Sequence, residues 1–337
     1  MSSSERIRRS AVALSVALTF VLSMGLSAPA LAVRQEKEKK KESVQGTPVL
    51  WRDPGDVSTF DLYAGPGGEA SKPDLSRVTF IKDETGGYSK KYRVRDASGR
   101  VWVAKIGKEA QPETAAARLL WAAGYIPEIS YLAPRVTIEG KGTFENVRFE
   151  ARPEDVKRLK EWRWESNPFT GTREFQGLKI LMALIENWDL KDANNRILAV
   201  SREGTNELHY IVSDLGATFG KTGGQNSPMS FLRNVKGSRN EPEDYASDKF
   251  VEGVEGGQVR LNFSGKNSGL MRGITVDDAK WLGGLLSRLS DQQLDDAFRA
   301  ANYTPEEIRM LTGAVRKRIN ELVALQGGQQ EAAPKTN

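Results

Sequence analysis

Cysteine is absent from this chain of 337 residues, and histidine occurs only once, as His209. Disulfide bonds, zinc–thiolate sites and cysteine nucleophiles are therefore excluded. A Ser-His-Asp triad or a histidine metal site would have to use His209. Because this residue directly precedes a short apolar run at 210–212, we interpret it as structural rather than catalytic.

The sequence also lacks a basic stripe with interleaved aromatic residues. The net charge is +5, but lysine and arginine are spread along the chain, so nucleic acid is not an expected partner. Beyond residue 26 no run is long and apolar enough to span a membrane. Hydrophobic residues make up 39% and charged residues 28%, which is typical of a globular protein.

The N-terminus has the pattern of a targeting segment. Arginines at positions 6, 8 and 9 precede an apolar run at 11–26, and Ala-Leu-Ala follows at 30–32. This order predicts a signal peptide over 1–32 and an exported protein, periplasmic or extracellular. An uncleaved membrane anchor is the alternative. Residues 33–48 are highly charged and residues 327–337 are polar, so we expect a disordered linker and a disordered tail there.

The rest of the chain falls into a β-rich part and a helical part. Residues 49–77 are rich in glycine, proline and aspartate and predict an extended segment packed on a domain. Residues 78–150 contain short β-type alternations and one helical pattern, whereas residues 151–326 are mainly helical around one hairpin. This order predicts an α+β fold with two lobes, an N-lobe at 78–150 and a C-lobe at 151–326.

Individual elements follow from the same patterns. Strands are expected at 78–81, 91–96 and 101–105, and helices at 112–121 and 175–185. Pro112 would be the first residue of its helix. Thr275, Ser290 and Thr304 have the pattern of helix N-caps. Residues 220–267 carry few apolar groups and predict a loop, either a mobile active-site loop or a poorly ordered one.

Polar residues with the chemistry of phosphoryl transfer gather between two apolar runs. Asp189, Lys191 and Asn194 lie close together, and Asp214 follows the apolar run at 210–212. A hairpin between them would bring Asp214 back beside Asn194. One carboxylate would then be placed to accept a hydroxyl proton, while the other carboxylate and the amide oxygen hold Mg²⁺.

A lysine and a glutamate upstream complete this set. Lys105 ends a predicted strand, and Glu113 lies in the helix that follows. An ion pair between them would point the ammonium group at phosphates. Taken alone, Lys105 would be a solvated surface lysine, and the Asp and Asn residues an ordinary turn that bonds its own backbone. The presence of every piece favours the functional interpretation.

The stretch from Gly216 to Thr222 is similar to a phosphate-binding P-loop. Only three residues separate its glycines, however, where four are needed. We therefore interpret Gly216 and Gly220 as residues that let the chain turn after Asp214.

The order and spacing of these residues resemble the protein-kinase-like fold over roughly residues 78–320. The matching stretches are Val-Ala-Lys at 103–105, Glu113, Trp-Asp-Leu-Lys-Asp-Ala-Asn-Asn at 188–195 and Ser-Asp-Leu-Gly at 213–216. The chain is more similar to atypical branches, such as HipA-type and phosphatidylinositol-type kinases, than to ordinary Ser/Thr kinases. The resemblance implies that Lys105 orients the phosphates of ATP, that Glu113 holds Lys105, and that Gly86 and Gly87 lie in the nucleotide-binding loop.

The resemblance also implies roles for the polar cluster. Asp189 would be the catalytic base, Lys191 a phosphate contact, and Asn194 and Asp214 the ligands of Mg²⁺. Some features of ordinary kinases are missing, because Gly86 and Gly87 do not form a Gly-x-Gly-x-x-Gly loop and no Ala-Pro-Glu follows Asp214. These differences argue against the substrate recognition of ordinary protein kinases and leave nucleotide chemistry in place.

Two functional hypotheses remain. The first is an exported kinase-like protein that binds Mg²⁺ and ATP between two lobes and transfers a phosphoryl group to an unknown acceptor. The second is a catalytically inactive, pseudokinase-like binding or scaffold protein of the cell envelope. The complete residue set favours the first hypothesis, and the missing glycine loop and the scarcity of ATP outside the cytoplasm favour the second.

Overall fold

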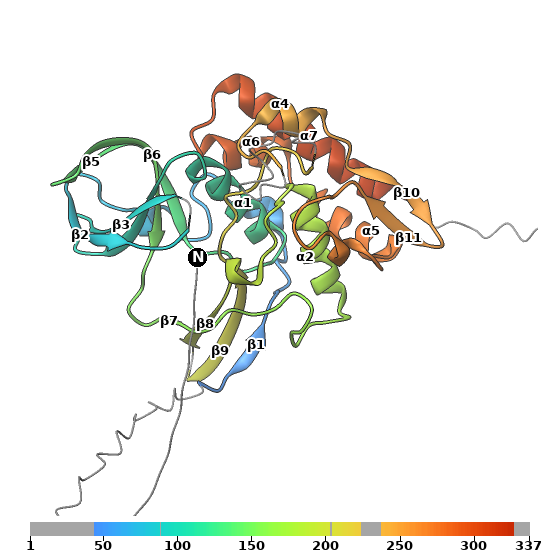
Figure 1. The fold of residues 1–337 in the computed structure, drawn as a ribbon, viewed down its shortest axis with the longest axis horizontal. Coiled ribbons are helices and arrows are strands. Elements are labelled where there is room, and N and C mark those ends of the chain that lie inside the picture. Colours follow the sequence, from blue (N-terminus) through green and yellow to red (C-terminus); the bar gives the residue numbers. More distant parts are fainter. Residues whose placement is uncertain (1–43, 88, 203, 224–236, 327–337) are drawn as a thin grey trace, which may run out of the picture. The chain divides into compact units, whose positions relative to one another are not determined.

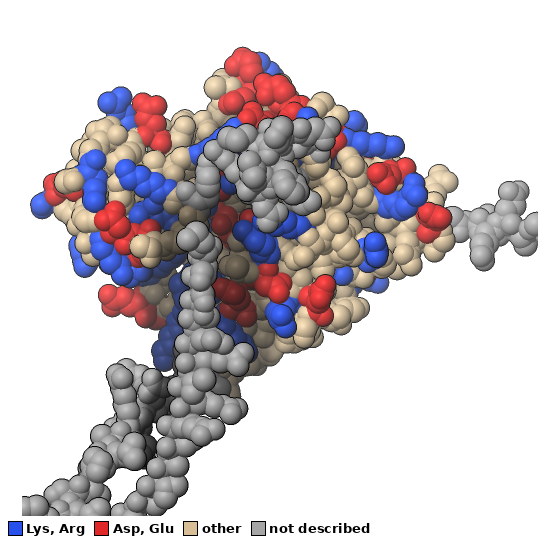
Figure 2. All heavy atoms as spheres, viewed as in Figure 1, with Lys and Arg blue, Asp and Glu red and all other residues tan. Residues whose placement is uncertain are grey.

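The computed structural model describes residues 44–87, 89–202, 204–223 and 237–326. The predicted signal peptide, most of the predicted linker and the predicted tail lie outside these ranges. Within them both helices and strands occur, which confirms the expected α+β content. No helix in the described ranges is both long and apolar enough to cross a bilayer. Basic and acidic side chains are interspersed over the visible part of the face in Figure 2.

A closed β-barrel forms the part of the chain that follows the N-terminal segment (Figure 1). Its strands, in sheet order, are β2 (Val78–Glu84), β3 (Lys90–Arg95), β4 (Val101–Ile106), β6 (Gly142–Ala151) and β5 (Ser130–Glu139). A short parallel pairing of β2 with β5 closes the barrel, and the other neighbours are antiparallel. Trp102 and Ala104 on β4 belong to the barrel core. Since side chains alternate along a strand, Lys105 points to the outside.

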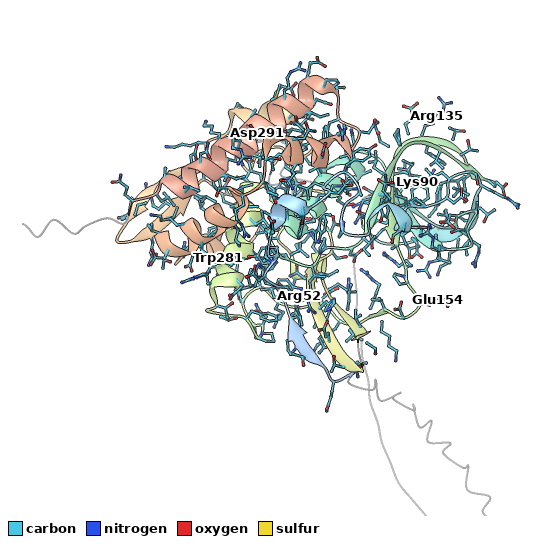
Figure 3. All side chains as sticks on the ribbon, turned by 180° about the vertical axis from the view of Figure 1, so that it is seen from behind. Arg52, Lys90, Arg135, Glu154, Trp281 and Asp291 are labelled. Carbon is cyan, nitrogen blue, oxygen red and sulfur yellow. The ribbon has the colours of Figure 1, made fainter. Side chains whose placement is uncertain are left out.

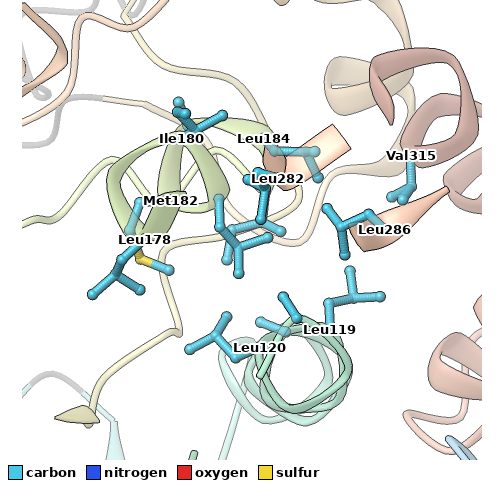
Figure 4. Close-up of a cluster of buried hydrophobic side chains, with 14 of the residues drawn as sticks. Leu119, Leu120, Leu178, Ile180, Met182, Leu184, Leu282, Leu286 and Val315 are labelled. Carbon is cyan, nitrogen blue, oxygen red and sulfur yellow. The ribbon is translucent and has the colours of Figure 1, made fainter. Parts of the chain in front are cut away.

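Helix α1 (Ala110–Ala122) connects β4 to β5 and packs into the core of the helical part. In Figure 4, Leu119 and Leu120 of this helix face leucines of two other helices, among them Leu178 and Leu282. The helix begins two residues earlier than predicted, so Pro112 is its third residue and not its first. Proline is tolerated there because the first backbone N–H groups of a helix have no partner within the helix.

A second sheet carries the predicted hairpin. Its strands, in sheet order, are β1 (Thr47–Val49), β9 (Thr205–Val212), β8 (Asn195–Arg202) and β7 (Lys157–Arg158). Strands β8 and β9 form the hairpin, with Asn195 opposite Val212. Thr47 and Pro48, the last residues of the predicted disordered linker, instead lie in β1, because they pair in parallel with the edge of β9.

The remaining described elements are mainly helical. The α-helices are α2 (Arg173–Leu184), α4 (Pro242–Ser247), α5 (Val276–Leu286), α6 (Asp291–Arg299) and α7 (Pro305–Ala324). Short 3-10 turns occur at η1 (Val57–Thr59), η2 (Glu69–Ser71), η3 (Asp192–Asn194) and η4 (Ser268–Met271). Thr275, Ser290 and Thr304 cap α5, α6 and α7 through capping boxes, which confirms the predicted N-caps.

The prediction of a loop over 220–267 is wrong for three segments of its described part. That part contains α4 and a hairpin of β10 (Val251–Glu255) and β11 (Gln258–Leu261), while residues 224–236 lie outside the described ranges. Gly256 and Gly257, both with positive φ, form the hairpin turn. The side chains of Val259 and Leu261 are buried in the helical core. The apolar alternation in β10 and β11 is short and is surrounded by polar and glycine residues, so the sequence did not indicate these strands.

Candidate functional site

Lys105 lies at the centre of a cluster of carboxylates on the outside of the barrel. Its ammonium nitrogen is 2.6 Å from Glu113, 2.9 Å from Glu109 and 3.5 Å from Asp214. The side chain is almost fully buried. Burial alone would lower the pKa of Lys105, but the carboxylates of Glu113, Asp214 and Glu109 raise it above its usual value. The lysine is therefore a permanent cation at the site.

Glu113 reaches Lys105 because α1 begins directly after β4 and covers that face of the barrel. The carboxylate is fully buried between two cations, with Arg148 on β6 at 3.0 Å. Burial raises the pKa of Glu113 to about 7, while Arg148 and Lys105 oppose this rise. The sequence predicted the pair of Lys105 with Glu113 but not Arg148, which lies opposite Lys105 on the neighbouring strand.

The hairpin places Asp214 beside Asn194, as its sequence pattern predicts. The backbone N–H groups of Ser213 and Asp214 donate to the carbonyl oxygen of Asn194 at 2.8 and 3.1 Å. The Asp214 carboxylate accepts a hydrogen bond of 3.1 Å from the N–H of Gly216. Although burial alone would raise the pKa of Asp214, Lys105 and hydrogen bonds to the Glu113 side chain and the Gly216 N–H lower it, so the group is anionic.

Asp189 is held by neighbours on three sides. Its carboxylate lies 2.8 Å from the ammonium nitrogen of Lys191 and 3.2 Å from that of Lys266. The side-chain amide of Asn194 donates to the backbone oxygen of Asp189 at 2.6 Å and to its carboxylate at 3.3 Å. The structure therefore brings Asp189, Lys191 and Asn194 together, and adds Lys266. Sequence reasoning missed Lys266 because it comes from a distant segment.

The donor set fits a magnesium ion that is also held by a nucleotide. The amide nitrogen of Asn194 faces Asp189, so its amide oxygen accepts no hydrogen bond from the described residues. The side chain of Asp214 is 36% exposed. Within the described ranges no group of three or more His, Cys, Asp or Glu side chains forms a metal site. A cation here would have one carboxylate and one amide oxygen, and phosphates and water would supply the rest.

Gly86 and Gly87 lie in the exposed loop between β2 and β3, both with positive φ. A Cβ atom on Gly87 would lie 3.1 Å from the ammonium nitrogen of Lys91. A Cβ atom on Gly86 would have no other atom within 4 Å. Lys91 is paired with Lys105 across the two strands and lowers the pKa of Asp214. The predicted loop is thus linked to the site through Lys91, a residue that sequence reasoning missed.

Glu109 is a further acidic residue of the site that the sequence did not indicate. This buried residue precedes α1, and its carboxylate contacts Lys105, the hydroxyl of Ser89 at 2.5 Å, and Arg239. Its side chain also packs on Gly216, where a Cβ atom would lie 2.8 Å from that of Glu109. A negative charge therefore fills the space between Lys105 and the segment after Asp214. No motif marks Glu109, since Arg239 reaches it across 130 positions.

Trp188 anchors the segment that brings Arg239 to the site. Its indole N–H donates to the carbonyl oxygen of Ser238 at 2.9 Å, and the guanidinium of Arg239 lies 4.8 Å from the ring centre. The structure thus gives this tryptophan a positioning role that the sequence did not indicate.

The glycines of the P-loop-like stretch lie where the chain changes direction and where other groups come close. Gly216 is in a turn and Gly220 in a bend. Neither Gly216 nor Gly220 has a positive φ. A Cβ atom on Gly220 would lie 2.4 Å from the carbonyl oxygen of Ser238. Lys221 is paired with Asp244 at 3.0 Å. The prediction that the chain turns at Gly216 and Gly220 is confirmed, and both positions also need a residue without a side chain.

His209 lies outside this site, on strand β9. Its ring nitrogen is 2.8 Å from the carboxylate of Glu207, which Arg52 also contacts at 2.5 Å. This pairing ties the segment after β1 to the hairpin and agrees with a structural role for the histidine.

No protein-family model matches the chain. No curated protein matches it either. Among solved structures, the chain is similar to the Helicobacter pylori proinflammatory kinase CtkA, with 11% identity over 74% of this chain and 98% of that chain and a TM-score of 0.44. A Golgi casein kinase with Mn/ADP bound has 9% identity over 75% of this chain and 72% of that chain, with a TM-score of 0.40.

The Rio2 kinase from Chaetomium thermophilum, in a complex with ADP/Mg²⁺ and phosphoaspartate, has 14% identity over 75% of this chain and 74% of that chain, with a TM-score of 0.33. These similar structures are all kinases. The TM-scores of these three structures all lie below 0.5.

Proposed function

We propose that the chain has a two-lobed kinase-like fold and transfers a phosphoryl group from a magnesium-bound nucleotide to an acceptor not yet identified. One observation carries the proposal. The buried pair of Lys105 and Glu113, on the barrel and α1, reaches Asp214 at the end of the hairpin, and the hairpin in turn places Asp214 beside Asn194. In this proposal a nucleotide would bind beside Lys105, with the metal ligands and the base close to its phosphates.

Each residue has a role in this proposal. The bound nucleotide supplies the transferable phosphoryl group. Lys105 orients the phosphates, and Asn194 and Asp214 hold Mg²⁺. Asp189 accepts the proton of the acceptor hydroxyl, and Lys191, 2.8 Å from it, stabilises negative charge on the phosphoryl group.

The loop with Gly86 and Gly87 would cover the phosphates. Both glycines have positive φ and are exposed, so the loop backbone can approach a ligand closely. Lys91 at the start of the next strand would add a second cation next to Lys105.

The alternative is a pseudokinase-like binding protein, and one observation favours it. The Glu109 carboxylate contacts Lys105 and packs on Gly216. It therefore competes with phosphate groups for the same ammonium. If Glu109 stays in place, the site keeps its architecture but binds nucleotide weakly.

A thermal-shift experiment with Mg²⁺ and ATP tests the proposal, with Asp214→Ala as the variant and Asp155→Ala, an exposed aspartate, as the matched control. Ligand at 100 times its dissociation constant should stabilise the wild type and the control by about 2.7 kcal/mol. The Asp214→Ala variant should show little shift. If none of the three proteins shows a shift in its thermal transition, nucleotide binding is contradicted.

Labelled ATP then separates the two functions. Transfer of the γ-phosphoryl group to the protein, to water or to an added acceptor, lost in Asp189→Ala, supports a phosphotransferase. Binding with no transfer supports the pseudokinase-like alternative.

Export is part of the proposal and rests on the sequence of residues 1–32. We expect the mature chain to begin at Val33. The measurement is the N-terminal mass of the protein recovered from its native host, and an intact residue 1 in a membrane fraction supports the anchor alternative.

A further inference from the structure

A cavity of about 560 Å³ lies apart from the candidate phosphotransfer site. None of the residues predicted to bind nucleotide or metal lines it. Its walls come from the segment after β1, the loop that follows α1, the segment after β6, and the β8–β9 hairpin. Figure 3 shows this side of the molecule, with Arg52, which lines the cavity, and Glu154, which follows the lining residue Pro153. The volume is in the usual range of small-molecule sites.

The walls are mostly apolar, with a few charged groups. Phe60 and Trp121 stack on each other at a ring distance of 4.3 Å and both line the cavity. Val156 and Val200 contribute aliphatic surface from two other elements. A ligand with a flat apolar body would bury its surface against such walls.

The charges on the walls disfavour an ion as ligand. Arg52 is paired with Glu207 at 2.5 Å, and Arg158 with Glu128 at 2.6 Å. Arg152 contacts Glu128 at 3.5 Å and also pairs with a second glutamate, outside the cavity. An anion would therefore displace existing partners of these arginines, and a cation would be repelled by them.

One buried polar atom in the walls lacks a hydrogen bond. Glu128 is 7% exposed, and its Oε1 atom accepts hydrogen bonds from Arg158 at 2.6 Å and from the hydroxyl of Ser213 at 2.8 Å. Its Oε2 atom accepts no hydrogen bond from the described residues, and the guanidinium of Arg152 lies 3.5 Å from it. Burial alone would raise the pKa of Glu128, but Arg152 and Arg158 lower it, so the carboxylate is anionic. A buried acceptor of this kind is costly unless a donor reaches it.

We propose that this cavity binds a neutral, largely apolar small molecule that donates a hydrogen bond to Glu128. The inference does not depend on the phosphotransfer proposal, because neither the walls nor the acceptor belong to that site.

Two neutral probes of nearly the same shape test the inference. Indole has an aromatic body and one N–H donor, and 1-methylindole has the same ring system without the donor. Binding to the full chain would be measured by ligand-observed NMR and calorimetry, with no nucleotide present. We expect indole to bind about tenfold or more tightly than its methyl analogue, because a hydrogen bond to a charged acceptor has at least that effect.

Two variants fill the cavity from different walls, so that the result does not depend on one of them folding. Val156→Trp acts from the segment after β6 and Val200→Trp from strand β8. Either variant that keeps the thermal transition of the wild type should lose indole binding. Equal affinity for indole and 1-methylindole, unchanged binding in a folded variant, or no binding of indole at millimolar concentration would overturn the proposal.

Discussion

At the scale of single residues, Glu109 occupies the side of Lys105 that the proposed nucleotide would need. The carboxylate of Glu109 is 2.9 Å from the ammonium of Lys105 and is also paired with Arg239. A phosphate group that approached Lys105 or Arg239 would compete with this carboxylate. Under the proposed function, displacement of Glu109 would therefore be part of the free-energy cost of binding a nucleotide.

Glu109→Gln should raise the affinity for Mg²⁺ and ATP by about tenfold, because the variant removes a competing charge worth ~1.4 kcal/mol. Calorimetric titration measures the change. Glu145→Gln, an exposed glutamate on β6, is the matched control and should behave as the wild type. Unchanged or weaker binding in Glu109→Gln means that this carboxylate supports the position of Lys105 and does not block it.

Glu113 should make stability depend on pH. Its pKa is raised to about 7 in the folded protein from 4.5, mainly by burial. The folded state therefore binds a proton that the unfolded state has lost over this interval. The contribution of Glu113 to stability is complete below pH 4.5 and is lost as pH rises to 7, by roughly 3 kcal/mol in all.

The measurement is urea unfolding of the wild type and of Glu113→Gln from pH 4.5 to pH 7.5. Glutamine also breaks the contacts to Lys105 and Arg148, so the comparison concerns slopes against pH and not absolute stabilities. In the wild type the free energy of unfolding should decline as pH rises, and in Glu113→Gln this decline should be absent. Parallel slopes would mean that Glu113 stays ionised throughout.

At the scale of elements, Arg318 ties α7 to the segment that leads from α2 to Asp189. This buried guanidinium donates to the carbonyl oxygens of Leu184 at 2.8 Å and Tyr245 at 2.9 Å, and it pairs with buried Glu186. Glu186 adopts a positive φ of 53° between α2 and Asp189. One residue of α7 thus fixes the path of the chain into the candidate site.

Arg318→Met should destabilise the protein by about 3–5 kcal/mol, because it removes a buried guanidinium that bonds the Glu186 carboxyl group and two backbone carbonyl oxygens. Arg309→Met on the same helix removes only an exposed ion pair with Glu306, so it should lower the free energy of unfolding by less than ~1 kcal/mol. Denaturant unfolding measures both. Adding Glu186→Gln to the first variant should recover part of the loss, and no recovery would contradict the role of the buried charge.

At the scale of the whole molecule, the cavity and the candidate site share one short connection. The Ser213 hydroxyl donates to Glu128, which lines the cavity, and accepts a hydrogen bond of 3.1 Å from Arg158. Ser213 directly precedes Asp214, and its backbone is bonded to Asn194. A ligand that holds Glu128 would therefore also hold the strand end that carries Asp214.

Saturating indole should strengthen the binding of Mg²⁺ and ATP by about fivefold, a coupling at the lower end of the usual range. Calorimetric titration with and without indole measures the effect. By reciprocity, nucleotide should strengthen indole binding by the same factor. Ser213→Ala should remove the coupling and leave indole binding itself intact. An equal nucleotide affinity at all indole concentrations would show that the two sites are independent.

The sequence by itself determined the local features of this protein. The alternation in β4 and the start of α1 lie close together in the chain, so the pair of Lys105 and Glu113 follows from neighbouring elements. The hairpin that brings Asp214 to Asn194 is also local, because both its strands and its turn are contiguous. The N-caps of α5, α6 and α7 depend on a few adjacent residues each. The catalytic and metal-binding roles of these residues stay predictions.

Only the tertiary structure decided which distant groups share the site. Arg239 reaches Glu109, and Lys266 reaches Asp189, through packing between segments far apart in the chain. Glu109 itself lies only four positions after Lys105, but no motif marks it or the other two residues. The close contact at Gly216 has the same origin, since it depends on how α1 and the chain after Asp214 approach each other. Patterns of alternation and capping describe neighbours along the chain, whereas charge balance at a buried site depends on neighbours in space.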